Sequence, residues 1–160
     1  MNILEQIIAK KRVEVEAKKG VVCIKDLEAS PFFKNETLSL CRFLLDENKT
    51  GIIAEFKRRS PSKGIINDTA TVEEVTQAYA KYGASGISVL TDHHFFGGSL
   101  DDLVLATINE VPLLRKDFMI DEYQIIEAKA HGAEVILLIA ACLSPKEVKH
   151  LASVAKNVGL

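Results

Sequence analysis

Two lysines and a glutamate occupy positions from which side chains of these types can move protons. Glu55 and Lys57 stand two residues apart at the end of the apolar run 51–56, so in a strand they share one face. Lys116 stands near the end of another apolar run, residues 112–118. A charged group at the end of a buried strand is costly unless it is paired or used, so these three are candidates for catalysis. The simpler interpretations are an ion pair at the sheet rim and a lysine that reaches solvent.

Two loops rich in polar or aromatic residues follow candidate strands. Residues 58–64 form a cationic loop suited to bind phosphate or carboxylate or to close as a lid, although such loops are usually only solvated. The second loop carries Asp92, His93 and His94, followed by two phenylalanines and two glycines. Adjacent side chains diverge and metal sites recruit several segments, so we expect no metal site here. The phenylalanines instead indicate an apolar wall for an aromatic substrate, or packing into a helix layer.

These candidates require a fold that brings several strand ends together. Short apolar runs alternate with segments that carry helix start and stop signals. We expect strands at residues 51–56, 86–90, 112–118 and 134–141. We expect helices at residues 2–19 and 38–46, from Thr71 to Gly83, from Ser99 to about 109, from Asp121 to about 132, and from Ser144 to Gly159. Nearly apolar strands separated by helices are typical of a parallel sheet.

Right-handed crossovers leave two architectures, a doubly wound open sheet and a (β/α)₈ barrel. The turn after the first strand, KRRSPSKG, fits neither the dinucleotide-binding nor the P-loop glycine pattern. Polar residues at several strand ends favour the barrel, whose active sites lie at that face. A full barrel typically takes ~250 residues. We therefore expect about half a TIM-type barrel, four βα units in residues 48–160, after an N-terminal helical extension, residues 1–47.

The composition excludes several classes of protein. The chain of 160 residues is 48% apolar and 26% charged, as in ordinary soluble domains, and its net charge of −2 does not favour nucleic acid or an anionic membrane. The three cysteines show neither zinc-binding nor disulfide spacing, so we expect a cytoplasmic protein. The longest apolar run, 135–143, is too short to span a bilayer, and the N-terminus lacks the apolar core of a signal peptide.

Four segments, in order and at the right spacing, resemble the indole-3-glycerol phosphate synthase family. They are IIAEFKRRSPSKG (52–64), SVLTDHHFFGGS (88–99), VPLLRKDFMIDEYQI (111–125) and AEVILLIAACLS (133–144). The two leading helices are similar to the N-terminal extension of that family. The resemblance covers essentially the whole chain and implies a TIM barrel.

The resemblance also implies an activity, that of a carbon–carbon lyase of tryptophan biosynthesis. Such an enzyme closes the ring of 1-(2-carboxyphenylamino)-1-deoxyribulose 5-phosphate with loss of carbon dioxide and water, and it needs neither metal nor organic cofactor. By resemblance, Lys116 is the general acid, Lys57 lies at the substrate anions and assists, and Glu55 positions both lysines. The resemblance assigns further substrate contacts to Ser60, Pro61, Phe95, Phe118 and Leu137, with Phe96 as the alternative to Phe95.

By the same resemblance, a catalytic glutamate, an asparagine and the main phosphate-binding loops of the family lie beyond Leu160. We therefore expect the 160-residue chain alone to be nearly inactive on its small phosphorylated substrate. We also expect it to self-associate through exposed sheet edges. Two other interpretations stay open: a different barrel enzyme acting on a phosphorylated sugar, and a non-catalytic half-barrel scaffold. The paired lysines and the SPSKG segment disfavour the first of these.

Overall fold

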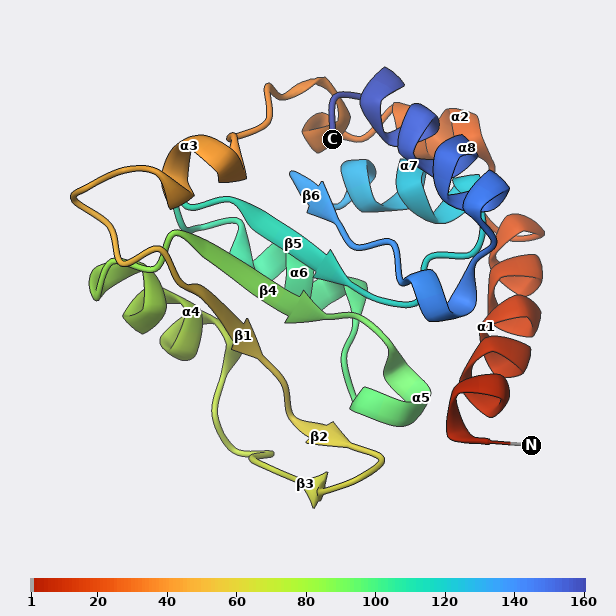
Figure 1. Cartoon of the computed structure of the whole chain (residues 1–160), viewed down its shortest axis with the longest axis horizontal. Coiled ribbons are helices and arrows are strands. Elements are labelled where there is room, and N and C mark those ends of the chain that lie inside the picture. The colour runs from red at the N-terminus through yellow and green to blue at the C-terminus, as the bar shows by residue number, and fades with distance from the viewer. Residues whose placement is uncertain (1) are drawn as a thin grey trace.

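The computed structural model, which describes residues 2–160, contains a four-stranded sheet in the order β1-β4-β5-β6 (Figure 1). Its strands are β1 (Ile53–Phe56), β4 (Gly86–Leu90), β5 (Leu113–Lys116) and β6 (Val135–Ile136). All three pairings are parallel. A doubly wound sheet reverses its strand order partway along the chain, whereas a barrel does not. The sequential order therefore confirms the predicted parallel α/β class and is that of a partial barrel.

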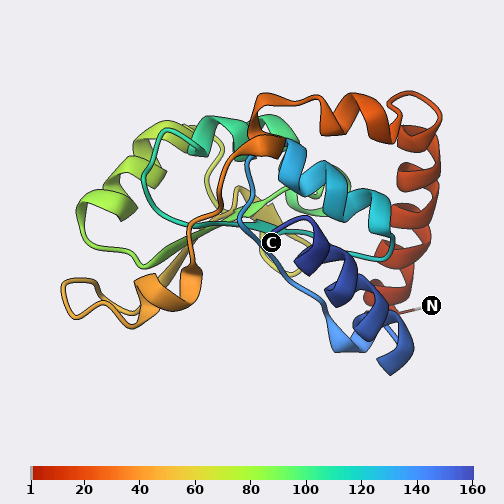
Figure 2. The same ribbon diagram turned by 90° about the horizontal axis from the view of Figure 1, so that it is seen from above.

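Helices that connect the strands pack against one face of the sheet. They are α4 (Val72–Lys81), α6 (Leu100–Ala106) and α7 (Glu122–Ala130), which lie together on one side in Figure 2; α8 (Pro145–Asn157) follows β6. The predicted N-caps are confirmed, because the side chains of Thr71, Ser99, Asp121 and Ser144 each accept a hydrogen bond from a backbone N–H of the first turn. Caps of this kind fix where each helix begins relative to the preceding strand end.

The main core lies between the sheet and these helices. Ile87 and Val89 of β4, Leu103 of α6 and Leu113 of β5 are almost completely buried there. Side chains of a strand alternate between faces, so the residues between them point to the opposite face of the sheet. That second face stays partly exposed, and it is the face on which a barrel places its interior.

The chain before β1 forms α1 (Ile3–Lys19), α2 (Ile24–Glu28), the 3₁₀ helix η1 (Pro31–Lys34) and α3 (Leu40–Leu44). Figure 1 shows α1 beside the ends toward which β4 and β5 point. Val15 and Leu27 of this region pack with Tyr123 of α7 in a second core. We did not predict α2 and η1, which have five and four residues and show no clear hydrophobic period in the sequence.

The structure corrects the prediction of a strand over residues 134–141. β6 contains only Val135–Ile136, and residues 140–142 form a second 3₁₀ helix, η2 (Ala140–Cys142). The reason is the register: only two residues of β6 pair with β5, so the rest of the apolar run has no ladder to join. An apolar run by itself does not distinguish a strand from other buried chain.

Both loops that sequence analysis singled out contain short regular elements. The loop after β1 forms a hairpin of β2 (Arg59–Ser60) and β3 (Gly64–Ile65). The loop after β4 forms α5 (His93–Phe96), which ends at Gly97 with φ of +66°. Within residues 2–160, none of the helices is both long and apolar enough to cross a membrane.

Candidate active site

Glu55 binds both candidate lysines on the partly exposed face of the sheet. Its Oε1 lies 3.3 Å from the Nζ of Lys57, and its Oε2 lies 3.2 Å from the Nζ of Lys116. Glu55 lies in β1, Lys57 directly follows β1, and Lys116 is the last residue of β5. The strand β4 lies between β1 and β5. The structure therefore brings the three candidate catalytic residues together.

The charges of this cluster favour an ionised carboxylate. Partial burial opposes ionisation of Glu55, but the charge of Lys116 and hydrogen bonds from Lys116, Ser88 and Lys57 outweigh burial, so its pKa lies below its usual value. The side chains of Glu55, Lys57 and Lys116 are each about a third exposed, at 29–33%. Both amines can therefore reach a bound molecule without a rearrangement of the sheet.

Ser88 is a part of this cluster that sequence analysis missed. Its hydroxyl donates a hydrogen bond of 3.0 Å to Glu55 Oε2, the same oxygen that contacts Lys116. The register explains the contact, because Ser88 lies directly opposite Glu55 in the β1–β4 pair. A single hydroxyl inside the otherwise apolar strand GISVL was the available signal.

The two arginines of the β1–β3 loop bind neighbouring chain rather than pointing freely into solvent. Arg58 forms an ion pair with Asp102 of α6, and Arg59 donates hydrogen bonds to the backbone oxygens of His93 (3.0 Å) and His94 (2.6 Å). These contacts tie the first loop to α5. The expected cationic loop is thus largely an anchor, in which Lys63 stays exposed.

The residues expected to contact the substrate lie in the β2–β3 hairpin, in α5 and just beyond β5 and β6. Ser60 bonds within its hairpin, where its Oγ accepts from the N–H of Lys63 at 3.2 Å, and Pro61 is exposed. Phe96, rather than Phe95, faces Phe118, with ring centroids 6.1 Å apart. Phe95 instead contacts His94 edge-on. Leu137, 37% exposed, lies just beyond β6.

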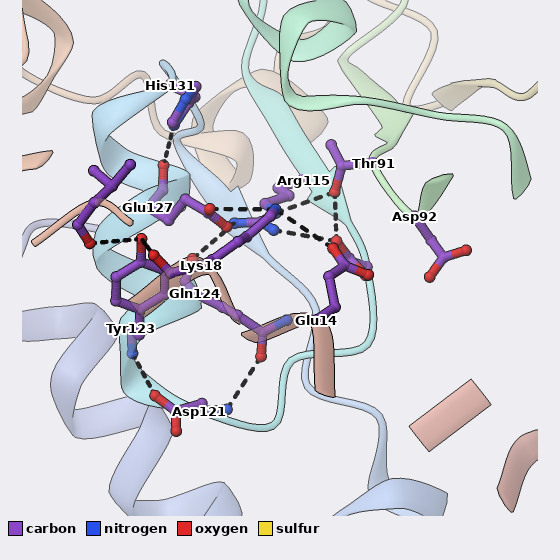
Figure 3. Close-up of polar contacts among 12 residues, drawn as sticks. Glu14, Lys18, Thr91, Asp92, Arg115, Asp121, Tyr123, Gln124, Glu127 and His131 are labelled. Atoms are coloured by element: carbon purple, nitrogen blue, oxygen red, sulfur yellow. Dashed lines mark hydrogen bonds and ion pairs between the residues drawn. The ribbon is translucent and has the colours of Figure 1, made fainter. Parts of the chain in front are cut away.

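A buried ionic cluster lies on the other face of β5. Arg115 and Asp117 flank Lys116 and point away from it, as alternation predicts, but they are 1% and 2% exposed rather than at the surface. Arg115 Nη2 lies 3.1 Å from Asp117 Oδ2, and Arg115 Nη1 lies 2.8 Å from Glu127 Oε2. Figure 3 shows Arg115 between Thr91 and Glu127. Sequence analysis missed this cluster, because the contact of Arg115 with Glu127 depends on how α7 packs against β5.

Asp92 and the two histidines do not form a metal site in the structure. The Asp92 carboxylate accepts the N–H of Phe95 at 2.8 Å and pairs with Lys11 at 2.9 Å, while both histidines are exposed. Across residues 2–160, no three His, Cys, Asp or Glu side chains cluster as metal ligands do. The three cysteines are free thiols.

A groove of about 1070 Å³ lies away from Glu55. Residues of α1, α2, α7 and α8 line it, among them Lys19, Ile24, Tyr123 and His150. Four of its polar lining residues contact one another, since Lys19 lies 2.6 Å from Asp121 and His150 lies 3.2 Å from Glu122. Glu55, Lys57 and Lys116 are not among its lining residues, so the groove is separate from the candidate site.

Comparison with known proteins identifies the family of this chain. The family model described as indole-3-glycerol phosphate synthase matches residues 4–160. The indole-3-glycerol phosphate synthase of Bacteroides thetaiotaomicron is 47% identical over 160 residues, which cover 99% of this chain and 61% of that protein. The protein of the same name from Salinibacter ruber is 42% identical, covering 100% of this chain and 60% of its own length, and that from Campylobacter jejuni is 40% identical, covering 99% and 62%.

The chain thus spans about three fifths of the length of the curated relatives that it matches. The match nevertheless covers the strands that carry Glu55, Lys57 and Lys116. This chain therefore belongs to the indole-3-glycerol phosphate synthase family.

Proposed function

We propose that this chain carries the lysine-bearing part of an active site that makes indole-3-glycerol phosphate. The substrate is 1-(2-carboxyphenylamino)-1-deoxyribulose 5-phosphate, and the reaction is ring closure with loss of carbon dioxide and water. The observation that carries the proposal is the contact of Glu55 with both Lys57 and Lys116. Membership of the family supports the reaction, because the relatives bear the name of that activity.

In this proposal Lys116 is the general acid. Negative charge develops on the substrate carbonyl oxygen as the ring closes, and a positioned ammonium group can donate the proton that neutralises it. Lys57 lies at the substrate anions and assists. Glu55 holds both amines at one level of the sheet, which is consistent with their distances of 3.3 and 3.2 Å from its oxygens.

The remaining substrate contacts are proposed from the family resemblance. Ser60 and Pro61 border the carboxylate end of the substrate, and the anilino ring lies against an apolar wall. Phe95, Phe118 and Leu137 form that wall, and the contact between Phe96 and Phe118 makes Phe96 an additional candidate. The proposed chemistry uses amines and a carboxylate and calls for no cofactor. We further infer a cytoplasmic location, for which the free cysteines are suitable.

A fusion protein tests the activity. Residues 1–160 are joined to the part of the Bacteroides thetaiotaomicron relative that follows the matched region; we refer to this fusion as the completed protein. We expect it to form product, seen as indole fluorescence, whereas the 160-residue chain alone should form almost none. Activity of the chain alone near that of the relative would refute the division of the site that we propose. A completed protein that folds but makes no product would favour a non-catalytic role.

The edges of the sheet suggest self-association of the 160-residue chain. β1 and β6 each pair on one side only, and parallel edges invite further pairing. Two apolar side chains at this edge are exposed: Ile52, just before β1, is 58% exposed, and Ile53, its first residue, is 40% exposed. We expect light scattering to give a mass above that of one chain, and a monomer over a wide concentration range would count against this expectation.

A further inference from the structure

Lys11 of α1 is a buried cation that the proposed reaction does not use. Its side chain is 1% exposed, and its Nζ lies 2.9 Å from Asp92 Oδ2, 3.0 Å from Asp117 Oδ1 and 2.9 Å from Glu14 Oε2. Asp92 follows β4 and Asp117 follows β5. One amine of the N-terminal helix therefore joins the two loops at the ends of neighbouring strands.

The same two carboxylates hold the backbone of two proposed wall residues. Asp92 Oδ1 accepts the N–H of Phe95 at 2.8 Å, and Asp117 Oδ1 accepts the N–H of Phe118 at 2.8 Å. Lys11 thus contacts each carboxylate directly beside the hydrogen bond that sets the position of a phenylalanine. The ring of Phe118 then contacts that of Phe96, which follows Phe95 in α5.

The electrostatics of the cluster keep Lys11 charged. Burial opposes the ammonium form, but Asp117, Asp92 and Glu14 outweigh burial and raise the pKa of Lys11 above its usual value. The carboxyl pKa of Asp117 is lowered, because Arg115 and Lys11 overcome the effect of its burial. The contact with Lys11 is the one ion pair of Asp92 among the described residues, so removing the amine would leave this buried carboxylate without a counter-charge.

We propose that Lys11 is a positioning residue for the aromatic side of the substrate site. It acts through Asp92 on Phe95 and through Asp117 on Phe118. This inference rests on the proposed function, since it assigns a role toward the anilino ring of that substrate. The contact between Lys116 and Glu55 lies on the other face of β5, so Lys11 affects ring binding more than proton transfer.

The first experiment measures kinetics of the completed protein with Lys11→Met, below the unfolding temperature of the variant. We expect KM to rise about tenfold or more, as for loss of a fitted apolar contact, while kcat changes less than about threefold. Lys11→Arg, which keeps the charge, should restore most of the affinity. Lys10→Met, at the exposed neighbouring position, is the matched control and should leave both constants unchanged. A purely structural lysine would lower the unfolding temperature without moving KM, which would overturn the proposal.

The second experiment needs no activity and uses the 160-residue chain itself. Amide hydrogen exchange should accelerate at Phe95 and Phe118 in Lys11→Met, while Ile87 and Val89 in the core of β4 keep their protection. Uniform acceleration, or none at the two phenylalanines, would overturn the proposal. If Lys11→Met does not fold, Asp92→Asn tests the same link, because the amide oxygen can still accept from Phe95 but no longer pairs with the amine. An inactive wild-type completed protein would count against the proposed function alone, and the exchange result would still decide the role of Lys11.

Discussion

Glu55 and Lys116 meet across an intervening strand, with Glu55 Oε2 3.2 Å from Lys116 Nζ. The parallel register makes this possible. Glu55 lies opposite Ser88, and Ser88 lies opposite Leu114, so Lys116 stands two residues further along β5 on the same face. Ser88 is small enough to leave the path open, and its hydroxyl binds the carboxylate. A larger side chain at position 88 would separate the carboxylate of Glu55 from the amine of Lys116.

Removal of the Glu55 charge should impair catalysis while preserving shape. In the completed protein, Glu55→Gln loses the ion pairs with Lys57 and Lys116, and we expect kcat to fall roughly 10²-fold, at the lower end of general acid–base effects. Ser88→Ala removes one hydrogen bond and should cost less. Steady-state assay of indole fluorescence compares the two. Equal activities of Glu55→Gln and wild type would show that the carboxylate does not hold the lysines.

Arg115 should be among the residues on which stability depends most. Arg115→Met leaves Asp117 and Glu127 buried without their shared guanidinium, and breaking a buried ion pair in this way costs about 3–5 kcal/mol. Lys149→Met, at an exposed position of α8, is the control and should change stability by less than about 0.5 kcal/mol. Urea unfolding followed by circular dichroism measures both. A small effect of Arg115→Met would mean that water replaces the lost partner.

Asp117 should make stability depend on pH in the acid range. Its pKa is lower in the folded chain than in the unfolded chain, where it is about 3.9. Its stabilising contribution is therefore complete above that value and is lost as the pH falls through the folded pKa. We expect Asp117→Asn to be much less stable than wild type at pH 7, and the difference in urea midpoint to narrow toward pH 3. A constant difference across this range would show that Asp117 does not titrate with folding.

Gly98 should not tolerate even a methyl group. A Cβ at this position would collide with the carbonyl oxygen of Leu90, so the chain after α5 would have to move off the end of β4. We expect Gly98→Ala to cost about 1–3 kcal/mol or more, as overpacking does. Gly20→Ala is the control, because Gly20 adopts a helical conformation and its Cβ would meet its nearest contact at 3.4 Å. Equal thermal unfolding temperatures for the two variants would contradict this account.

The features that sequence reasoning predicted depend on local rules. Caps at Thr71, Ser99, Asp121 and Ser144 fix helix starts through side chains within a few residues. The alternation of a strand places Glu55 and Lys57 on one face. The parallel order of the sheet then places β1 and β5 on either side of β4. The candidate site could be predicted because local rules place the side chains on each strand and the parallel order of the strands brings β1 and β5 close together.

The features that escaped prediction depend on distant segments. The partners of Lys11 are 81 and 106 positions away in sequence, at Asp92 and Asp117, and no periodicity links them. The end of β6 depends on how far β5 extends beside it, which the apolar run 135–143 does not reveal. The short helix α5 depends on capping by Asp92, whose side chain drew attention as a possible metal ligand instead.

If Lys116 supplies the proton for ring closure, removal of its amine should stop catalysis without unfolding the chain. The most direct measurement is indole fluorescence from the completed protein with Lys116→Met beside Lys149→Met. We expect Lys116→Met to lower kcat by roughly 10²–10⁴-fold with little loss of stability, because the side chain is 30% exposed. Lys149→Met should match wild type. A folded Lys116→Met protein that turns over substrate within about threefold of wild type would contradict the account.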